Sequence, residues 1–150
     1  MPAITLEAIE AKQTELSELI AQFKANEPIL WIFPEVSIEL RPGERYAGHV
    51  LDVGGHISHH LVLMAPRPDT KLNWQDSKNW AESVGGTLPD RQEQALLYAN
   101  CKPHLKPEWH WSCETHKDDA SYAWSCNFST GSQSLGNKRY EGSAVAVRRV

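Results

Sequence analysis

The chain has 150 residues, of which 41% are hydrophobic and 23% are charged, and its formal net charge is -4. This length is enough for one globular domain with a sizeable core that needs no disulfide or metal. The basic residues form no patch or run, which argues against a protein that binds nucleic acid or anionic membranes. No stretch approaches the ~18 apolar residues of a membrane span, and the acidic N-terminus lacks the features of a secretory signal. We therefore expect the chain to fold in a reducing cytoplasm.

Residues 1–28 are predicted to form an amphipathic, coiled-coil-like helix from Thr5 to about Ala25. Thr5 is a suitable N-cap, and Asn26 and Pro28 end the pattern. The apolar positions of a heptad repeat are Leu6, Ile9, Leu16, Ile20 and Phe23, with Gln13 as the one polar exception. Because a lone helix of this length is marginally stable, we expect it to form a homo-oligomer, with packing on its own domain as the alternative.

Residues 29–65 are predicted to be a β-rich connecting segment. The apolar run at 29–33 and the alternating pattern at 36–40 indicate two strands. Two further strands, at 46–53 and 61–64, flank a Gly-Gly turn. Two prolines then mark a boundary, so a separate domain is expected at 66–150.

Two short helices are predicted next, and capping residues mark where each begins. Asn73 precedes the first, which has Asp76 at its third position and Gly85-Gly86 at its end. Asp90 precedes the second, with Glu93 at the third position, the pattern of a capping box. Beyond Pro107, alternating residues predict strands. They are Trp109, Trp111 and Cys113, then Tyr122, Trp124, Cys126 and Phe128, and finally the strand at 144–150.

Several motifs of this second half have the order and spacing of a known family. They are Trp74, Trp80-Ala81, Gly85-Gly86, Leu88-Pro89, Arg91, Glu93, Trp109, Trp111-Ser112, Glu114, Ala123-Trp124, Phe128, Gly131 and Val147-Arg148-Arg149. In these features residues 61–150 resemble the DUF1566, or Lcl-type, domain, which is similar to C-type-lectin-like domains and to formylglycine-generating enzymes. The resemblance implies an α+β fold, with two helices on a small twisted antiparallel sheet, here preceded by the β-rich segment and the N-terminal helix. It also implies that most of the six tryptophans belong to the core.

Two of the cysteines raise the question of whether the chain is a thiol-dependent enzyme. Formylglycine-generating enzymes, to which the resemblance extends, use two cysteines that lie close together on one C-terminal segment. Here Cys113 and Cys126 are separated by 13 positions and both follow a serine, so that motif is not reproduced. We therefore expect no enzymatic activity from these thiols, and a disulfide between the two cysteines stays open.

The histidines and acidic residues do not have metal-ligand spacing. His56, His59 and His60 are clustered, but no zinc motif of the Cys-x2-Cys or His-x3-His kind brings three ligands together. The calcium loops that C-type lectins carry are also not matched, since Asp90 is better explained as a helix cap. We expect no cofactor and no metal, and a thiol- or metal-dependent enzyme remains the second alternative.

Two long polar segments, 114–121 and 129–142, are the candidates for binding. In the family that the chain resembles, variable loops near the C-terminus form the binding face, and Tyr and Arg are enriched at interface hot spots. The candidate ligand-binding residues are His116, Asp118, Asn137, Lys138, Arg139 and Tyr140. Ordinary solvated loops are the structural alternative.

These features together predict a non-enzymatic recognition module that binds a protein or surface ligand and no nucleic acid or membrane. The short helix ahead of such a domain resembles proteins encoded by phages and prophages, which implies a place in the host cytoplasm or the virion. Inhibition of a host factor or defence complex is one version of this hypothesis. A calcium-independent carbohydrate-binding lectin is the alternative.

Overall fold

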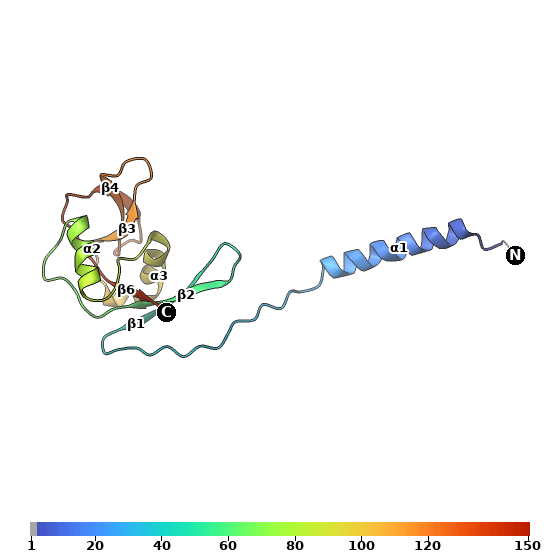
Figure 1. The fold of residues 1–150 in the computed structure, drawn as a ribbon, viewed down its shortest axis with the longest axis horizontal. Coiled ribbons are helices and arrows are strands. Elements are labelled where there is room, and N and C mark those ends of the chain that lie inside the picture. Colours follow the sequence, from blue (N-terminus) through green and yellow to red (C-terminus); the bar gives the residue numbers. More distant parts are fainter. Residues whose placement is uncertain (1–2) are drawn as a thin grey trace. The chain divides into compact units, whose positions relative to one another are not determined.

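The computed structural model describes residues 3–150 and divides into two units, the second of which begins at residue 38. The first unit contains helix α1 (Leu6–Ala25), shown in blue in Figure 1. Thr5 caps this helix as predicted, because its Oγ1 accepts a hydrogen bond from the Ala8 amide at 3.1 Å. No residue of α1 is buried, so all five apolar residues of the predicted heptad stripe are exposed.

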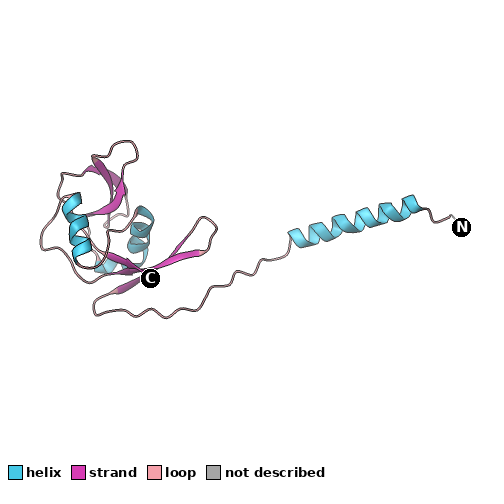
Figure 2. Ribbon diagram, in the orientation of Figure 1, coloured by secondary structure: helices cyan, strands magenta, loops and turns pink. Residues whose placement is uncertain are grey.

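Residues 27–44, which follow α1, contain no strand, as Figure 2 shows. The two strands predicted at 29–33 and 36–40 are therefore wrong. A strand needs a neighbour to satisfy its backbone N–H and C=O groups, and no strand of the described residues pairs with this segment. Pro28 and Pro34, which flank the first of these segments, have no amide hydrogen to donate to a neighbouring strand. Apolar composition alone is not enough to make a strand here.

The second unit is built on a sheet with the strand order β1-β2-β6. Strands β1 (Arg45–Leu51) and β2 (Ile57–Leu63) form the predicted hairpin, with Gly54-Gly55 in its turn. Strand β6 (Val147–Arg149) pairs antiparallel with the other edge of β2. The last strand of the chain therefore completes the sheet that the hairpin begins. For this reason the compact unit begins well before the predicted boundary at residues 65–66.

Between β2 and β6 the chain forms two helices and a second sheet. Helix α2 spans Trp74–Ser83, α3 spans Arg91–Cys101, and a short 3-10 helix, η1, spans Lys102–His104. The second sheet has the order β3-β4-β5. Its strands are β3 (Trp109–Thr115), β4 (Tyr122–Asn127) and β5 (Gln133–Asn137). The described residues thus form an α+β fold with three α-helices and two antiparallel three-stranded sheets, which confirms the predicted fold class.

The predicted caps of α2 and α3 are also present. Asn73 Oδ1 accepts a hydrogen bond from the Asp76 amide at 2.8 Å at the start of α2. Asp90 and Glu93 form a reciprocal capping box at the start of α3. Gly85 follows α2 with a φ of +86°, a left-handed conformation that favours glycine.

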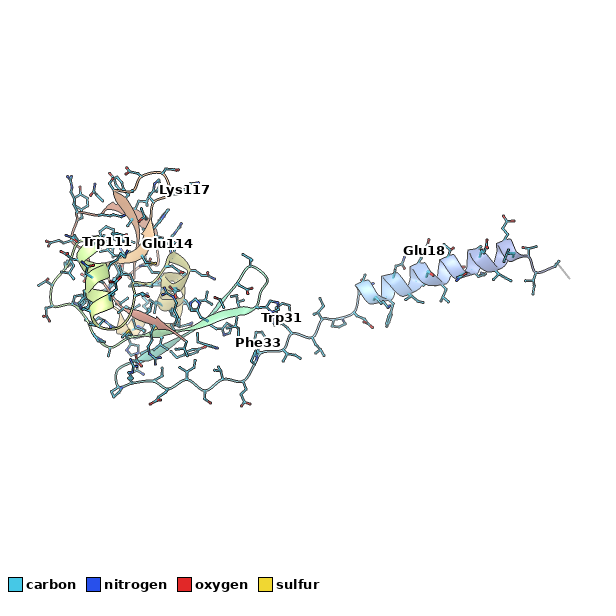
Figure 3. The ribbon with its side chains drawn as sticks, viewed as in Figure 1. Glu18, Trp31, Phe33, Trp111, Glu114 and Lys117 are labelled. Carbon is cyan, nitrogen blue, oxygen red and sulfur yellow. The ribbon has the colours of Figure 1, made fainter. Side chains whose placement is uncertain are left out.

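The core has two apolar clusters. In one, Leu97 of α3 packs against the first sheet, at Leu61 and Val147. In the other, Trp74 of α2 belongs to the same cluster as Trp111 of β3, which has no exposed surface and is labelled in Figure 3. Trp80 and Trp109 are half-buried at the edge of this second cluster, and Trp124 is half-buried with the Arg91 guanidinium 3.5 Å from its ring centroid. Most of the tryptophans therefore help to hold the fold together.

A fully buried carboxylate joins α3 to the first sheet. Glu93 accepts hydrogen bonds from Arg149 Nη2 at 2.6 Å and Nε at 2.8 Å, and from the Asp90 amide at 2.9 Å. His59 Nε2 lies 2.8 Å from its second carboxylate oxygen. Burial alone would raise the pKa of Glu93, but the hydrogen bonds from Arg149, Asp90 and His59 outweigh it and hold that pKa below its ordinary value.

We predict that Arg149→Met lowers the free energy of unfolding by about 3 kcal/mol or more at neutral pH, because it leaves the buried Glu93 charge without its main partner. Glu93→Gln should cost less, since the Arg149 side chain is 35% exposed and can be solvated. Because the folded-state pKa of Glu93 is lowered, the stability it confers is present above the unfolded pKa. That stability is lost as the pH falls through the folded-state value.

Urea unfolding of both variants at neutral pH and near pH 4 tests this prediction. Arg139→Met, an exposed position away from the network, is the matched control and should change stability by less than about 0.5 kcal/mol. A loss for Arg149→Met no larger than that of the control would contradict the prediction.

Candidate recognition surface

The two polar segments chosen from the sequence meet at one end of the second sheet. The pairing of β4 with β5 places Tyr122 opposite Asn137, and the Lys138 amide donates to the Ser121 carbonyl at 2.9 Å. The β3–β4 loop, with Lys117 labelled in Figure 3, is thereby joined to the segment that follows β5. We call residues 116–121 and 137–141 the loop-end surface. It contains all six candidate ligand-binding residues.

Backbone hydrogen bonds shape the β3–β4 loop. His116 Nδ1 accepts from the amides of Asp118 at 3.2 Å and Asp119 at 3.1 Å, so the imidazole closes the turn. Asp119 in turn accepts from the amide of Ser121 at 3.0 Å and from its hydroxyl at 2.6 Å. These hydrogen bonds from Ser121 lower the pKa of Asp119. His116 therefore holds the loop in place, and its Nδ1 is occupied.

Lys138 braces the two segments against α2. Its ammonium group donates to Thr115 Oγ1 at 2.9 Å and lies 3.9 Å from the centroid of the Trp74 ring. Its carbonyl accepts from the Trp74 amide at 3.1 Å. Partial burial, and then repulsion by the nearby Lys78, lower the pKa of Lys138. This lysine was predicted as a ligand-binding residue, but in the structure its ammonium group already has two partners.

Asn137 shapes the second segment. Its side-chain oxygen accepts from the Arg139 amide at 3.1 Å, and its carbonyl accepts from the Tyr140 amide at 3.0 Å. The tight turn that results presents the Arg139 and Tyr140 side chains to solvent. The guanidinium carbon of Arg139 lies 5.5 Å from the Tyr140 ring centroid, and Tyr140 is 54% exposed.

The six predicted residues thus divide into two groups of different chemistry. His116, Asn137 and Lys138 stabilise the shape of the loops through their own hydrogen bonds. The side chains of Asp118, Arg139 and Tyr140 are exposed at the surface that these bonds create. The structure therefore brings the six together, and the side chains of the second group are the more exposed ones.

Next to the loop-end surface lies a groove of about 470 Å³ that shares Tyr140 with it. Trp109 provides a second aromatic wall, and its ring is close to Gly142, where an added Cβ would lie 2.3 Å from it. The remaining polar lining is uncharged and consists of Ser125, Asn127, Thr130, Ser132 and Ser134. No sequence motif identified this groove. The pairing of β4 with β5, which places Ser125 opposite Ser134, creates it.

The three cysteines are free thiols in the structure. Cys126 and Cys101 are buried and Cys113 is half-buried, and burial raises the pKa of all three. Cys126 faces His110 across the β3–β4 pair, and the register shifts between Trp111 and Thr115. Cys113 therefore does not lie opposite Cys126.

No family model matches the sequence, and no curated protein matches it either. The likeness to DUF1566 domains therefore rests on the motif spacing alone.

Metal ligands and membrane spans were also sought in the part of the chain that the structure describes. Among residues 3–150, no three side chains of His, Cys, Asp or Glu converge in a way that could hold a metal ion. Within the same residues, no helix combines the length and the apolar character that crossing a membrane requires.

Proposed function

We propose that this chain is a non-enzymatic recognition module that binds a protein partner through the loop-end surface. The observation that carries the proposal is the internal bracing of that surface. His116, Asn137 and Lys138 fix two long polar segments through hydrogen bonds within the protein. A loop that is already ordered loses less conformational entropy on binding than a flexible one, and this favours affinity.

The exposed side chains of the surface have the chemistry of a protein interface. Tyr140 and Arg139 belong to the residue types that dominate binding energy at protein–protein interfaces. Asp118 is exposed on the same loop-end surface, which therefore offers both signs of charge and an aromatic ring. Loops that display such groups on a rigid scaffold are a common place for binding function.

The state of the thiols supports a non-enzymatic function. Thiol catalysis depends on the thiolate, and a low thiol pKa with partial exposure favours it. Burial raises the pKa of Cys113 and Cys126 instead. Two such thiols in a core behave as small hydrophobic side chains.

The family resemblance supports a wider hypothesis about biological context. Under this proposal the chain is a DUF1566-type, C-type-lectin-like protein encoded by a phage or prophage, and it acts in the host cytoplasm or in the virion. Binding to a host factor or a defence complex, with inhibition as the result, would need no cofactor. The bracing of the loop-end surface fits such a function, since inhibition by binding depends on shape and affinity alone.

We also propose that α1 forms a homo-oligomer with α1 of other copies. The five residues of its apolar stripe are between 46% and 71% exposed, and a single helix of 20 residues is marginally stable in water. A second copy offers the same stripe at the same spacing, as a coiled coil requires.

A second candidate function is the binding of a neutral carbohydrate in the groove beside the loop-end surface. The groove combines two aromatic residues, Trp109 and Tyr140, with hydroxyl and amide side chains, and its lining carries no side chain that is charged at neutral pH. Aromatic faces suit the apolar faces of a sugar ring, while hydroxyl and amide groups suit its hydroxyls. No calcium ligand is needed for this mode of binding.

For the protein-binding proposal, we predict that Arg139→Ala with Tyr140→Ala reduces partner capture about tenfold or more, since hot-spot residues contribute about 2 kcal/mol or more. The tagged full-length chain would be used as bait in a lysate of the bacterium that carries the gene, with quantitative mass spectrometry as the readout. Arg45→Ala with Tyr46→Ala, an exposed Arg-Tyr pair on β1, is the matched control. Equal capture by both double variants would contradict the proposal.

For the carbohydrate candidate, we predict binding on a glycan array that persists with a calcium chelator. Tyr140→Ala should abolish the signal, while Tyr140→Phe keeps the ring and should retain most of it. Tyr122→Ala, an exposed tyrosine of β4 outside the groove, is the control. An array without hits would count against this function and leave the protein-binding proposal intact.

For the oligomer, we predict that multi-angle light scattering of the full-length chain gives a mass above one chain, and that Leu16→Glu with Ile20→Glu reduces it to a monomer. Two charges placed in a buried apolar seam are strongly unfavourable. The control, Ala11→Glu with Gln22→Glu, adds the same charge on the helix face that carries Glu18 and should keep the oligomer (Figure 3). A monomeric unmodified chain would remove the proposal.

A further inference from the structure

A pocket of about 520 Å³ shares no lining residue with the loop-end surface. Its walls come from three separate parts of the second unit: residues 67–71, residues 103–110 and residues 143–144. The volume falls in the range of about 300–1,000 Å³ that is usual for small-molecule sites. The polar residues that matter for its chemistry are Arg67, Lys71, Lys106, Glu108, His110 and Ser143.

His110 offers an unused hydrogen-bond acceptor in this pocket. The residue is only 2% exposed, and its Nδ1 lies 2.8 Å from the Glu108 carbonyl oxygen. Because a carbonyl oxygen can only accept, Nδ1 must carry the hydrogen. Burial lowers the pKa of His110 to about 4, so the ring is neutral at physiological pH and Nε2 holds a lone pair. The one hydrogen bond that the His110 ring forms with residues 3–150 uses Nδ1, so Nε2 is left without a protein partner.

Arg67 brings a positive charge to the same pocket without a carboxylate partner. Its guanidinium donates to four backbone carbonyls, those of Met64 at 2.5 Å, Pro66 at 2.9 Å, Ala65 at 3.2 Å and His104 at 3.3 Å. No carboxylate of the described residues lies within ion-pair distance of it. Partial burial removes water from the guanidinium and lowers the pKa of Arg67. An anion in the pocket would compensate that charge.

The other charged groups of the pocket leave an excess of positive charge near His110. Glu108 is already neutralised, because it accepts a hydrogen bond from Ser143 Oγ and lies 3.5 Å from Lys71 Nζ. Lys106 is exposed and, like Arg67, acts electrostatically on the His110 ring. Asp69, which is exposed, is the remaining carboxylate of the lining. Arg67 and Lys106 are therefore the cations available to a ligand.

We infer that this pocket binds a small organic anion that carries a hydroxyl group, of the hydroxycarboxylate class. The anionic group lies by Arg67 and Lys106, and the hydroxyl donates to His110 Nε2. The anionic group supplies the counter-charge that Arg67 lacks, and the hydroxyl occupies the unused acceptor at His110 Nε2. The inference is independent of the loop-end surface and of its proposed partner.

The test uses two probes that differ by one hydroxyl group, L-malate and succinate. Each is titrated into the full-length, isotope-labelled chain and followed by amide and imidazole NMR. We expect saturable shifts in residues 67–71, 103–110 and 143–144, and malate should bind about threefold to tenfold more tightly than succinate, as one net hydrogen bond predicts. The 15N resonance of His110 Nε2 should shift with malate and stay nearly constant with succinate.

A charge variant and its control complete the experiment. Lys106→Ala should weaken malate binding about threefold to fivefold, the effect of one partly exposed ion pair. Lys117→Ala removes the same charge from the β3–β4 loop and should leave binding unchanged. Three results would overturn the inference: no saturable shift in the pocket, equal affinity for malate and succinate, or equal weakening by the two lysine variants.

Discussion

The buried ion pair between Glu93 and Arg149 is the constraint on which the rest of the second unit depends. Glu93 sits in the first turn of α3, and Arg149 belongs to β6, 56 residues later in the sequence. Because β6 completes the sheet of β1 and β2, the pair fixes α3 against that sheet. The same carboxylate takes part in the capping box with Asp90, so the start of α3 and the closing strand are held by one group. Removing Arg149 would leave a fully buried carboxylate without its main partner, which is strongly destabilising, whereas the partly exposed Arg149 can be solvated if Glu93 is removed.

The start of α3 also connects this frame to the second sheet. The Arg91 amide donates to Glu114 of β3 at 2.6 Å, and the Arg91 side chain donates to Gln133 of β5 at 2.9 Å. Both sheets are therefore positioned from the N-terminal turn of a single helix. The loop-end surface follows the C-terminal ends of β3 and β5, so these contacts help to fix the strands that carry it. Its bracing by Lys138 adds to a scaffold that is already fixed.

Features that depend on local chemistry could be predicted from the sequence. The caps at Thr5, Asn73 and Asp90 are formed by residues three positions apart, and each is present in the structure. The strands expected at 29–33 and 36–40 failed because strand formation depends on a distant partner, and composition cannot supply one.

The binding surfaces also combine features that the sequence predicts with features that depend on distant contacts. The two polar segments of the loop-end surface could be chosen from composition, but the roles of their residues could not. Lys138, for example, is held by Thr115 and Trp74, which lie far away in sequence. The pocket around His110 draws its walls from three segments, and none of these has a motif of its own. Its chemistry depends on which groups lack a partner in the folded protein, such as Arg67 without a carboxylate and His110 Nε2 without a donor. The spacing of residues in the sequence does not show this.

If the proposed oligomer forms through the α1 stripe, it increases the number of loop-end surfaces carried by one assembly. Each copy would then present a recognition surface on the same assembly, joined through residues 26–44, a segment without strands. When one surface binds, the next meets its target at an effective concentration set by that connection, which reaches millimolar values for short flexible links. The assembly could then bind its target tightly even where the affinity of a single surface is low, as is expected for a surface with a few exposed groups such as Asp118, Arg139 and Tyr140. An exposed apolar stripe on a helix is an aggregation risk for a monomer, and oligomerisation would bury that stripe while increasing the avidity of the recognition surface.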